Sequence, residues 1–239
     1  MNVLAVDVGG THVKILATGQ KEGREFASGP ELTAKQMVAG VKKLAGDWKY
    51  DAVAIGYPGP VLRNRPVAEP HNLGPGWVAF DYEAAFGCPT KLINDAAMQA
   101  LGGYKGGKLL FLGLGTGLGT AMIVDGIVEP MELGHLPYRK ATYEDYVGLR
   151  GLKHYGKKKW RKHVADVIER LRAALEPDDV LIGGGNAKKL AAPPPGCRLG
   201  ENANAFLGGF RLWRQAAEGK RAARSPARPR LKAHSPKAA

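Results

Sequence analysis

The sequence predicts an α/β protein made of two similar lobes. Short apolar runs typical of buried strands alternate with segments whose apolar residues recur at helical spacing. The chain opens at residues 2–17 with a strand, a glycine turn and a second strand, and the same pattern returns about 106 residues later, at residues 108–124. Because each half opens on the same glycine hairpin, we expect two lobes of related structure.

The first half contains further strands and two helices. Strands are predicted at residues 51–56 and 91–93, on their apolar content. One helix is predicted from Thr33, whose hydroxyl is placed to cap the first turn, and another from about Asp95 to Leu101. Between these helices, the run from Pro58 to Pro60 breaks the chain sharply.

The second half repeats this organisation. After the hairpin, an amphipathic helix carries the apolar positions from Trp160 to Leu175 and is stopped by Pro177. A strand follows at residues 180–182, and a last amphipathic helix spans residues 203–213. We therefore expect an N-terminal lobe at residues 1–105, a C-terminal lobe at 106–218 whose last helix can pack back on the first lobe, and a basic disordered tail at 219–239.

The net charge of +13 is concentrated in two segments. Residues 150–163 and 220–239 hold seven basic residues each and no acidic ones, which leaves 21 basic and 22 acidic residues elsewhere. A basic protein invites a nucleic-acid-binding interpretation. Since the body is nearly neutral, we expect no nucleic-acid partner beyond weak electrostatic contacts of the tail.

Cysteine content and hydropathy point to the cytoplasm. The two cysteines, Cys88 and Cys197, form neither a CxxC pair nor a zinc spacing, which favours a reducing compartment. No apolar run approaches the roughly 18 residues of a membrane span, so no membrane partner is expected. The first strand begins at once, and no signal peptide is expected before it.

Two glycine turns are candidate phosphate sites. In the first, Gly9 and Gly10 allow backbone amides to approach an anion, Thr11 adds a hydroxyl, Lys14 follows, and Asp7 can face magnesium, directly or through water. A plain β-hairpin with a surface lysine is the alternative. The second turn is formed by Gly115, Thr116 and Gly117. Two such turns at equivalent places suggest phosphates held between the lobes, with a pair of ordinary hairpins as the alternative.

Two further motifs carry side chains suited to sugar chemistry. Asp95 follows Asn94 between a strand and a helix, so its carboxylate can accept a proton from a hydroxyl while Asn94 holds the neighbouring hydroxyl. The alternative is helix capping. Glu132 and His135 lie three residues apart and can bind vicinal hydroxyls of a sugar, or they belong to an ordinary turn.

Taken together and in this order, these segments resemble the ROK family of sugar kinases over residues 3–217. The matching segments are the two phosphate loops at residues 7–14 and 114–120, the G-x-P-G segment at 56–60, the catalytic segment at 93–96, the sugar-binding motif at 132–135, and the strand and glycine turn beside adenosine at 180–186.

The resemblance implies an actin-like, hexokinase-like (RNase H-like) α/β fold with a cleft between two lobes. It also implies phosphoryl transfer to a hexose hydroxyl, with glucose 6-phosphate formed from glucose, and a homodimer. Asp95 would be the base that activates the hydroxyl. The implied sugar-binding residues are Asn72, Asn94, Asp95, Glu132 and His135, and the implied donor-binding residues include Gly183, Gly184 and Gly185.

The chain departs from the family at residues 136–155. Many members carry a cysteine-rich zinc segment there, whereas this chain has no cysteine in it, so no structural zinc is expected. Glu144 is the predicted substitute for another sugar-binding glutamate. In this respect the chain resembles the zinc-free polyphosphate glucokinases of the family. The first strand also leaves no room for the DNA-binding domain with which the family's repressors begin.

The donor and the exact function stay open at this point. ATP requires an adenosine pocket at Gly183 to Asn186, whereas polyphosphate requires a basic track. Candidates for that track are the tail and Lys153, Lys157, Lys158, Lys159, Arg161 and Lys162. Lysines on a solvated helix face are the alternative. The rival functions are a kinase for mannose, fructose or an amino sugar, a non-catalytic sugar sensor, and a nucleic-acid-binding protein.

Overall fold

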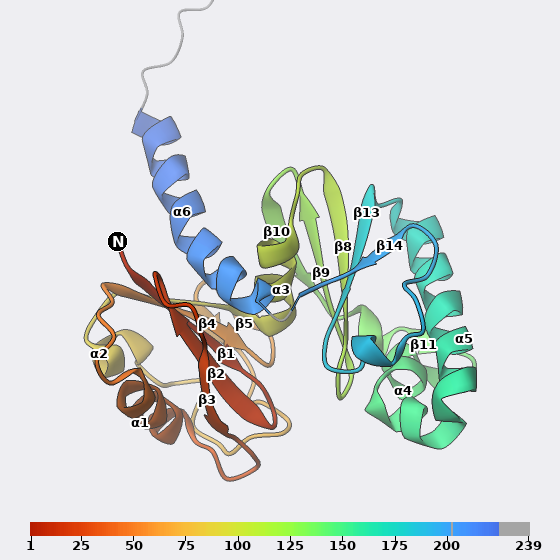
Figure 1. Cartoon of the computed structure of the whole chain (residues 1–239), viewed down its shortest axis with the longest axis horizontal. Helices are drawn as coiled ribbons and strands as arrows, with labels where there is room; N and C mark the ends of the chain where they lie inside the picture. Colours follow the sequence, from red (N-terminus) through yellow and green to blue (C-terminus); the bar gives the residue numbers. More distant parts are fainter. Residues whose placement is uncertain (202, 225–239) are drawn as a thin grey trace, which may run out of the picture.

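The computed structural model describes residues 1–201 and 203–224 and contains two five-stranded sheets of the same topology (Figure 1). The strand orders are β3-β2-β1-β4-β7 and β10-β9-β8-β13-β14. In each sheet the first three strands are antiparallel and the last two join in parallel. The repeated order confirms the expectation of two similar lobes.

The strands that the apolar runs predict, β1, β2, β4, β7, β8, β9 and β13, lie within one or two residues of their predicted bounds, whereas β3, β10, β14 and the small hairpins were not predicted. The first sheet consists of β1 (Val3–Val8), β2 (His12–Ala17), β3 (Arg24–Ala27), β4 (Ala52–Tyr57) and β7 (Thr90–Asn94). The second consists of β8 (Lys108–Leu114), β9 (Leu118–Val124), β10 (Ile127–Met131), β13 (Asp179–Gly183) and β14 (Cys197–Leu199). Two small hairpins complete the strands: β5 (Val61–Leu62) with β6 (Arg65–Pro66), and β11 (Pro137–Tyr138) with β12 (Ala141–Thr142).

One face of the first sheet is covered by α1 (Ala34–Ala45) and α2 (Tyr82–Phe86). Thr33 caps α1 as predicted, and with Gln36 it forms a reciprocal capping box. Strand periodicity turns Leu4, Val6 and Val8 of β1 toward these helices, which leaves Asp7 on the opposite face of the sheet.

The second sheet is covered by α4 (Tyr143–Val147) and α5 (Leu149–Leu175). The helix predicted up to Leu175 begins earlier than its apolar pattern shows, and Gly156 interrupts it with φ 70° and ψ 162°. Short 3₁₀ turns, η1 (Leu133–His135) and η2 (Ala187–Lys189), flank this layer. Trp160 is fully buried, and its indole N–H donates to the Val147 carbonyl at 2.7 Å.

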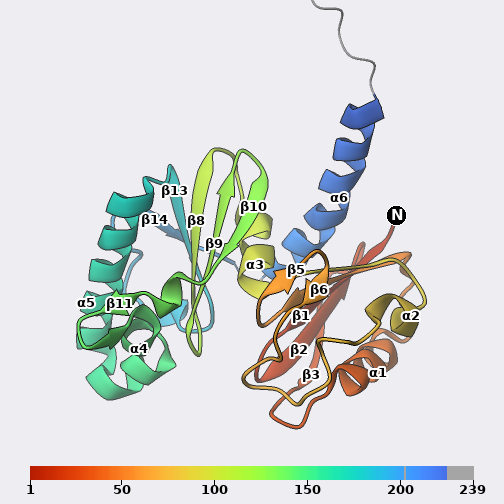
Figure 2. The same ribbon diagram turned by 180° about the vertical axis from the view of Figure 1, so that it is seen from behind.

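Two helices, α3 (Asp95–Gly103) and α6 (Asn204–Arg224), lie between the two sheets in both views (Figures 1 and 2). The apolar face of α3 packs on the second sheet, against Leu109 and Phe111 of β8, although the predicted boundary at residue 105 assigns this helix to the first lobe. The last helix, α6, packs against α3 and against β1 and β4 of the first sheet. Its Trp213 donates to the Val53 carbonyl at 3.1 Å.

The C-terminal end of α6 includes the first residues of the predicted tail. The structure continues α6 to Arg224, five residues past Gly219, because Lys, Arg and Ala at these positions are good helix formers. Residues 225–239 of the predicted tail lie outside the described residues. Within the described ranges, none of the helices is long and apolar enough to cross a membrane.

Candidate active site

The N-terminus of α3 brings Asp95 next to the first sheet at the position of Asp7. Asp7 pairs in register with Gly56 of the neighbouring parallel strand β4. A Cβ built on Gly56 would lie 3.4 Å from the Cα of Asp95 and would collide with Met98. Only glycine therefore allows α3 to approach β4 so closely, and this approach places Asp95 near Asp7.

Asn94 is the residue that caps α3. Its side-chain oxygen accepts from the Ala97 amide at 3.1 Å, and its side-chain amide donates to the Gly59 carbonyl at 3.2 Å. Asp95 is the first residue of the helix, and its Oδ1 accepts from the Ala96 amide at 2.7 Å. The capping role thus falls to Asn94, whose buried amide also ties α3 to the G-x-P-G segment.

The first glycine turn closes the hairpin between β1 and β2. The Gly9 amide donates to the His12 carbonyl at 3.0 Å, and the Ser28 hydroxyl donates to the Gly9 carbonyl at 2.6 Å. A Cβ on Gly10 would lie 3.3 Å from the Cβ of Asn72, so the predicted sugar-binding Asn72 lies against this turn. Thr11 is exposed beside it.

The second glycine turn is held by two other segments of its own lobe. The Gly115 carbonyl accepts from the Asn186 side chain at 2.8 Å and from the Leu149 amide at 3.0 Å. Gly184 has φ +82° and packs against the Leu114 backbone, where a Cβ would collide. The glycine turn at Gly183 to Gly185 therefore lies directly against the Gly115 turn.

Glu132, His135 and Glu144 lie near the same turn. The His135 Nε2 is 3.7 Å from Glu144 Oε1 in an exposed pair. A Cβ on Gly117 would collide with the Glu144 carboxylate, which places Glu144 against the second glycine turn. Thr142 caps α4, and Tyr143 and Tyr146 are buried on the side of the helix that faces the core. This leaves Glu144 on the opposite side of α4. The structure thus brings the predicted substitute Glu144 to His135.

Charged residues from both lobes act on the pKa of Asp95. Burial, followed by the negative charges of Asp7 and Glu132, raises the pKa of Asp95 to about 7 despite the opposing effect of the Ala96 hydrogen bond. Burial raises the pKa of Asp7 to about 6 despite the opposing effect of the nearby Lys14. A carboxylate with a pKa near neutrality is well suited to accept a proton at physiological pH.

We expect Asp95→Asn to stabilise the fold at alkaline pH. Between the ordinary pKa of 3.8 and about 7, the folded protein binds more protons at Asp95 than the unfolded chain does. The unfolding free energy therefore falls as the pH rises across this interval. Because Asp95 keeps some accessible surface, we expect the variant to gain about 2 kcal/mol at about pH 8 and much less at about pH 5. Urea titrations without added divalent cation measure the unfolding free energies of the variant and the wild type at both pH values. An equal gain in stability at the two pH values would contradict this expectation.

The residues present fit magnesium as a site with one protein carboxylate. Among the side chains of residues 1–201 and 203–214, no group of three or more His, Cys, Asp or Glu residues is arranged to hold a metal ion. Magnesium commonly uses one or two carboxylates together with waters and substrate phosphates. Asp7, beside a glycine turn and close to a second carboxylate whose repulsion a cation would relieve, has the chemistry for such a site.

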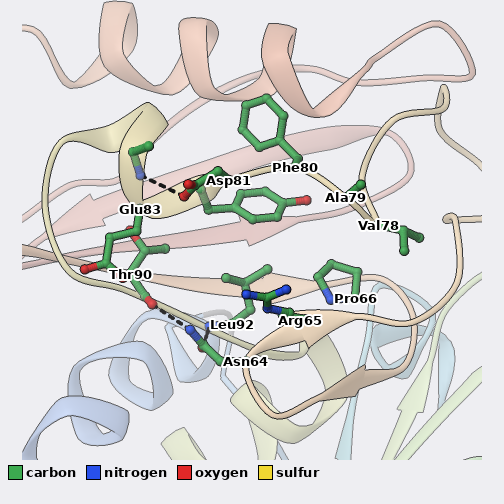
Figure 3. Close-up of a pocket in the computed structure, with 12 residues that line it drawn as sticks. Asn64, Arg65, Pro66, Val78, Ala79, Phe80, Asp81, Glu83, Thr90 and Leu92 are labelled. Carbon is green, nitrogen blue, oxygen red and sulfur yellow. Dashed lines mark hydrogen bonds between the residues drawn. The ribbon is translucent and has the colours of Figure 1, made fainter.

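Two cavities lie away from these residues. One, of about 520 Å³, lies between the β5–β6 hairpin and α2, with Arg65, Phe80 and Asp81 on its walls (Figure 3). The other, of about 610 Å³, lies between the C-terminal part of α5 and Pro194 and Pro195. None of the predicted site residues lines either cavity. The candidate site is instead defined by Asp95, which lies close to Gly56 of the first sheet and within electrostatic range of Glu132 of the second lobe.

Sequence reasoning missed contacts that support the glycine turns. Ser28 holds the first turn and Asn186 the second, while Gly119 allows the first turn of α3 to approach β9, its Cβ position being 3.1 Å from the Cβ of Ala96. Asn186 and Gly119 lie in segments that the sequence singles out, but their supporting contacts were not predicted. Ser28 carries no local signal, because its partner Gly9 is distant in sequence.

Comparison with known proteins agrees with this geometry. A family model described as the ROK family matches residues 3–144. The polyphosphate glucokinase of Mycobacterium tuberculosis (strain CDC 1551 / Oshkosh) is 26% identical over 208 residues, covering 77% of each chain. Inorganic polyphosphate/ATP-glucomannokinase from Arthrobacter sp. strain KM superimposes with a TM-score of 0.76 at 21% identity, covering 90% of this chain and 99% of the other. A ROK family glucokinase from Streptomyces griseus, solved with glucose and AMPPNP, gives 0.70 at 18% identity, covering 90% and 100%.

The duplicated sheets and these structural neighbours define an α/β protein of the actin-like, two-lobed class. The family match covers more than half of the chain and is more specific. The chain belongs to the ROK family, as the resemblance of its motifs predicts, and the proteins matched above are named as sugar kinases.

Proposed function

We propose that the protein is a sugar kinase that transfers the terminal phosphoryl group of ATP or polyphosphate to the 6-hydroxyl of glucose. The observation that carries this proposal is the position of Asp95. Its carboxylate begins α3 and interacts with the charges of Asp7 from the first sheet and Glu132 from the second lobe. This supports a role for Asp95 between the predicted phosphate turn that follows Asp7 and the predicted sugar-binding motif that begins at Glu132.

In the proposed reaction, Asp95 accepts the proton of the sugar hydroxyl. The hydroxyl oxygen then forms a bond to the terminal phosphorus of the donor, and the bond between that phosphorus and the bridging oxygen breaks, so that the shortened donor leaves with the bonding electrons. Phosphoryl transfer requires mainly positioning and charge stabilisation. The Ala96 amide, which binds Asp95 Oδ1 at 2.7 Å, fixes the direction of the carboxylate.

The sugar would bind to the side chains that surround Asp95. Glu132, His135 and Glu144 approach from the second lobe, and Asn72 approaches from the first. Asn94 already uses its oxygen and one amide hydrogen within the protein. We therefore assign it mainly to orienting Asp95, with at most one remaining amide hydrogen for the sugar.

The donor phosphates would lie at the two glycine turns. Backbone amides and the Thr11 and Thr116 hydroxyls can donate to phosphate oxygens, and Lys14 adds a positive charge beside Asp7. Magnesium held at Asp7 would neutralise the phosphate charge when bound. The turn at Gly183 to Gly185 would face the adenosine of ATP, because Asn186 ties it to Gly115.

Glucose phosphorylation measured with ATP and with polyphosphate in parallel tests this function. We expect glucose 6-phosphate to form with at least one donor. Mannose, fructose and N-acetylmannosamine serve as rival acceptors in the same assay. Sugar binding without turnover on all four acceptors and both donors would overturn the proposal in favour of a sugar sensor.

Glu144→Gln should weaken glucose binding. The substitution keeps the size of the side chain but removes the charge that faces His135 at 3.7 Å. A hydrogen bond to a charged group contributes enough that we expect the KM for glucose to rise about tenfold or more, with a smaller change in kcat. Glu129→Gln on the exposed edge strand β10 is the matched control. An unchanged KM in the Glu144 variant would remove this residue from the sugar site.

A further inference from the structure

A strip of cationic side chains begins at the second glycine turn and continues over the surface of the second lobe. We define it as the basic track: Lys157, Lys158 and Arg161 of α5 with Lys188 and Lys189 of η2. Three hydrogen bonds connect it to the turn. Arg161 Nε donates to the Lys189 carbonyl at 2.8 Å, Lys189 Nζ to Asn186 Oδ1 at 3.0 Å, and Asn186 Nδ2 to the Gly115 carbonyl at 2.8 Å.

The charges of the basic track are not balanced by the protein. Among the side chains of residues 1–201 and 203–214, no carboxylate lies within ion-pair distance of its five members. Lys157 and Lys158 are four and three residues before Arg161, so their like charges share one helix face, which destabilises a helix. An anion bound along this face would reverse the effect.

We infer that the basic track binds the distal part of a linear polyphosphate whose reacting end lies at the Gly115 turn. The inference rests on the proposed function and names the donor class that this surface selects. The phosphates of ATP end in adenosine close to the Gly183 turn, so ATP would leave the track unused. A polyphosphate chain carries negative charge along its whole length, as the track requires.

The position of the track favours polyphosphate over a nucleic acid. Its start is hydrogen-bonded to a candidate phosphate loop of the active site rather than lying on a separate face. Of the two aromatic residues next to it in sequence, Trp160 is fully buried, and Tyr155 is stacked on Tyr146 at a centroid distance of 5.2 Å, so neither is free to stack on bases. Single-stranded nucleic acids commonly use such free aromatic surfaces.

The test compares a track variant, Lys157→Gln with Lys158→Gln and Lys188→Gln, with a control variant, Lys35→Gln with Lys42→Gln and Lys43→Gln on α1. All six lysines are exposed. We expect the track variant to raise the KM for long-chain polyphosphate about tenfold, and to leave the KM for ATP and tripolyphosphate within about twofold. The slope of log KM against log salt for the long chain should fall by about 2, since each lost phosphate contact removes about 0.7.

Equal KM values for long-chain polyphosphate in the track and control variants would overturn the inference. Binding of long-chain polyphosphate to the full-length wild type and variants is also measured directly, so that the test does not depend on turnover. If the wild type phosphorylates no sugar, the proposed function fails, while weaker polyphosphate binding by the track variant alone still supports the track. Single-stranded RNA of equal charge serves as the competing ligand. If the protein binds this RNA more tightly than polyphosphate, and the track variant loses the RNA binding, the surface is a nucleic-acid site and the inference is overturned.

Discussion

Asp95→Asn is expected to lower kcat for glucose phosphorylation by about 10²–10⁴-fold, which is the usual contribution of a general base. The substitution preserves the shape of the side chain and its hydrogen bond from the Ala96 amide, which is 2.7 Å long in the wild type. It removes only the ability to accept the hydroxyl proton. The measurement is steady-state turnover with saturating glucose and donor, together with calorimetric titration of glucose.

Glucose affinity should change much less than turnover, because Glu132, His135 and Glu144 are untouched. Asp125→Asn, in the exposed turn between β9 and β10, is the matched control and should retain full activity. Near-normal turnover in the Asp95 variant would show that another group accepts the proton. A loss of glucose binding equal to the loss of turnover would instead make Asp95 a sugar ligand.

Gly208→Ala should destabilise the protein by about 1–3 kcal/mol, the usual cost of overpacking. Gly208 of α6 lies against α3, and a Cβ at this position would collide with the Met98 carbonyl. Gly102 of α3 faces the Asn204 backbone in the same way. Because alanine is the better helix former by about 1 kcal/mol, helix propensity alone predicts the opposite sign. Urea denaturation of the variant and the wild type distinguishes destabilisation by overpacking from stabilisation by helix propensity.

The same substitution should also lower activity, because the crossing of α3 and α6 sets the position of Asp95. Arg211 strengthens this crossing by donating to the carbonyls of Leu101, Gly102 and Tyr104 at 2.8–3.0 Å. Leu207→Ala, at an exposed neighbouring position of α6, is the control and should leave stability nearly unchanged. A Gly208→Ala protein more stable than wild type would contradict the close crossing.

Most strands and helices could be predicted from local patterns, since buried strands and amphipathic helices carry their periodicity in the sequence. The cap at Thr33 and the duplicated glycine hairpins are examples. The position of α3 could not be predicted in this way. Its packing against both sheets depends on Gly56 of β4 and Gly119 of β9, whose contacts with α3 are set by tertiary structure. The kink at Gly156 was hidden because the basic residues around it carry no apolar period.

The motifs of the candidate site were visible in the sequence, whereas their arrangement was not. Asp95, Glu132 and His135 stand out by residue type and spacing. That His135 meets Glu144, and that Asn72 lies on Gly10, depends on the short helix α4 and on the segment before Trp77. At Asn94, the sequence left sugar binding and helix capping open. The structure shows that its side chain caps α3, and adds a hydrogen bond to the Gly59 carbonyl that the sequence does not indicate.

Phosphorus NMR of the wild type and of Asp95→Asn, each with glucose and with ATP or polyphosphate, tests the central claim most directly. We predict that a glucose 6-phosphate resonance grows in the wild-type samples with at least one donor, and that its rate falls at least about 10²-fold in the variant. Absence of this resonance from every wild-type sample, while glucose still binds, would contradict the account, as would its growth at the wild-type rate in the Asp95 variant.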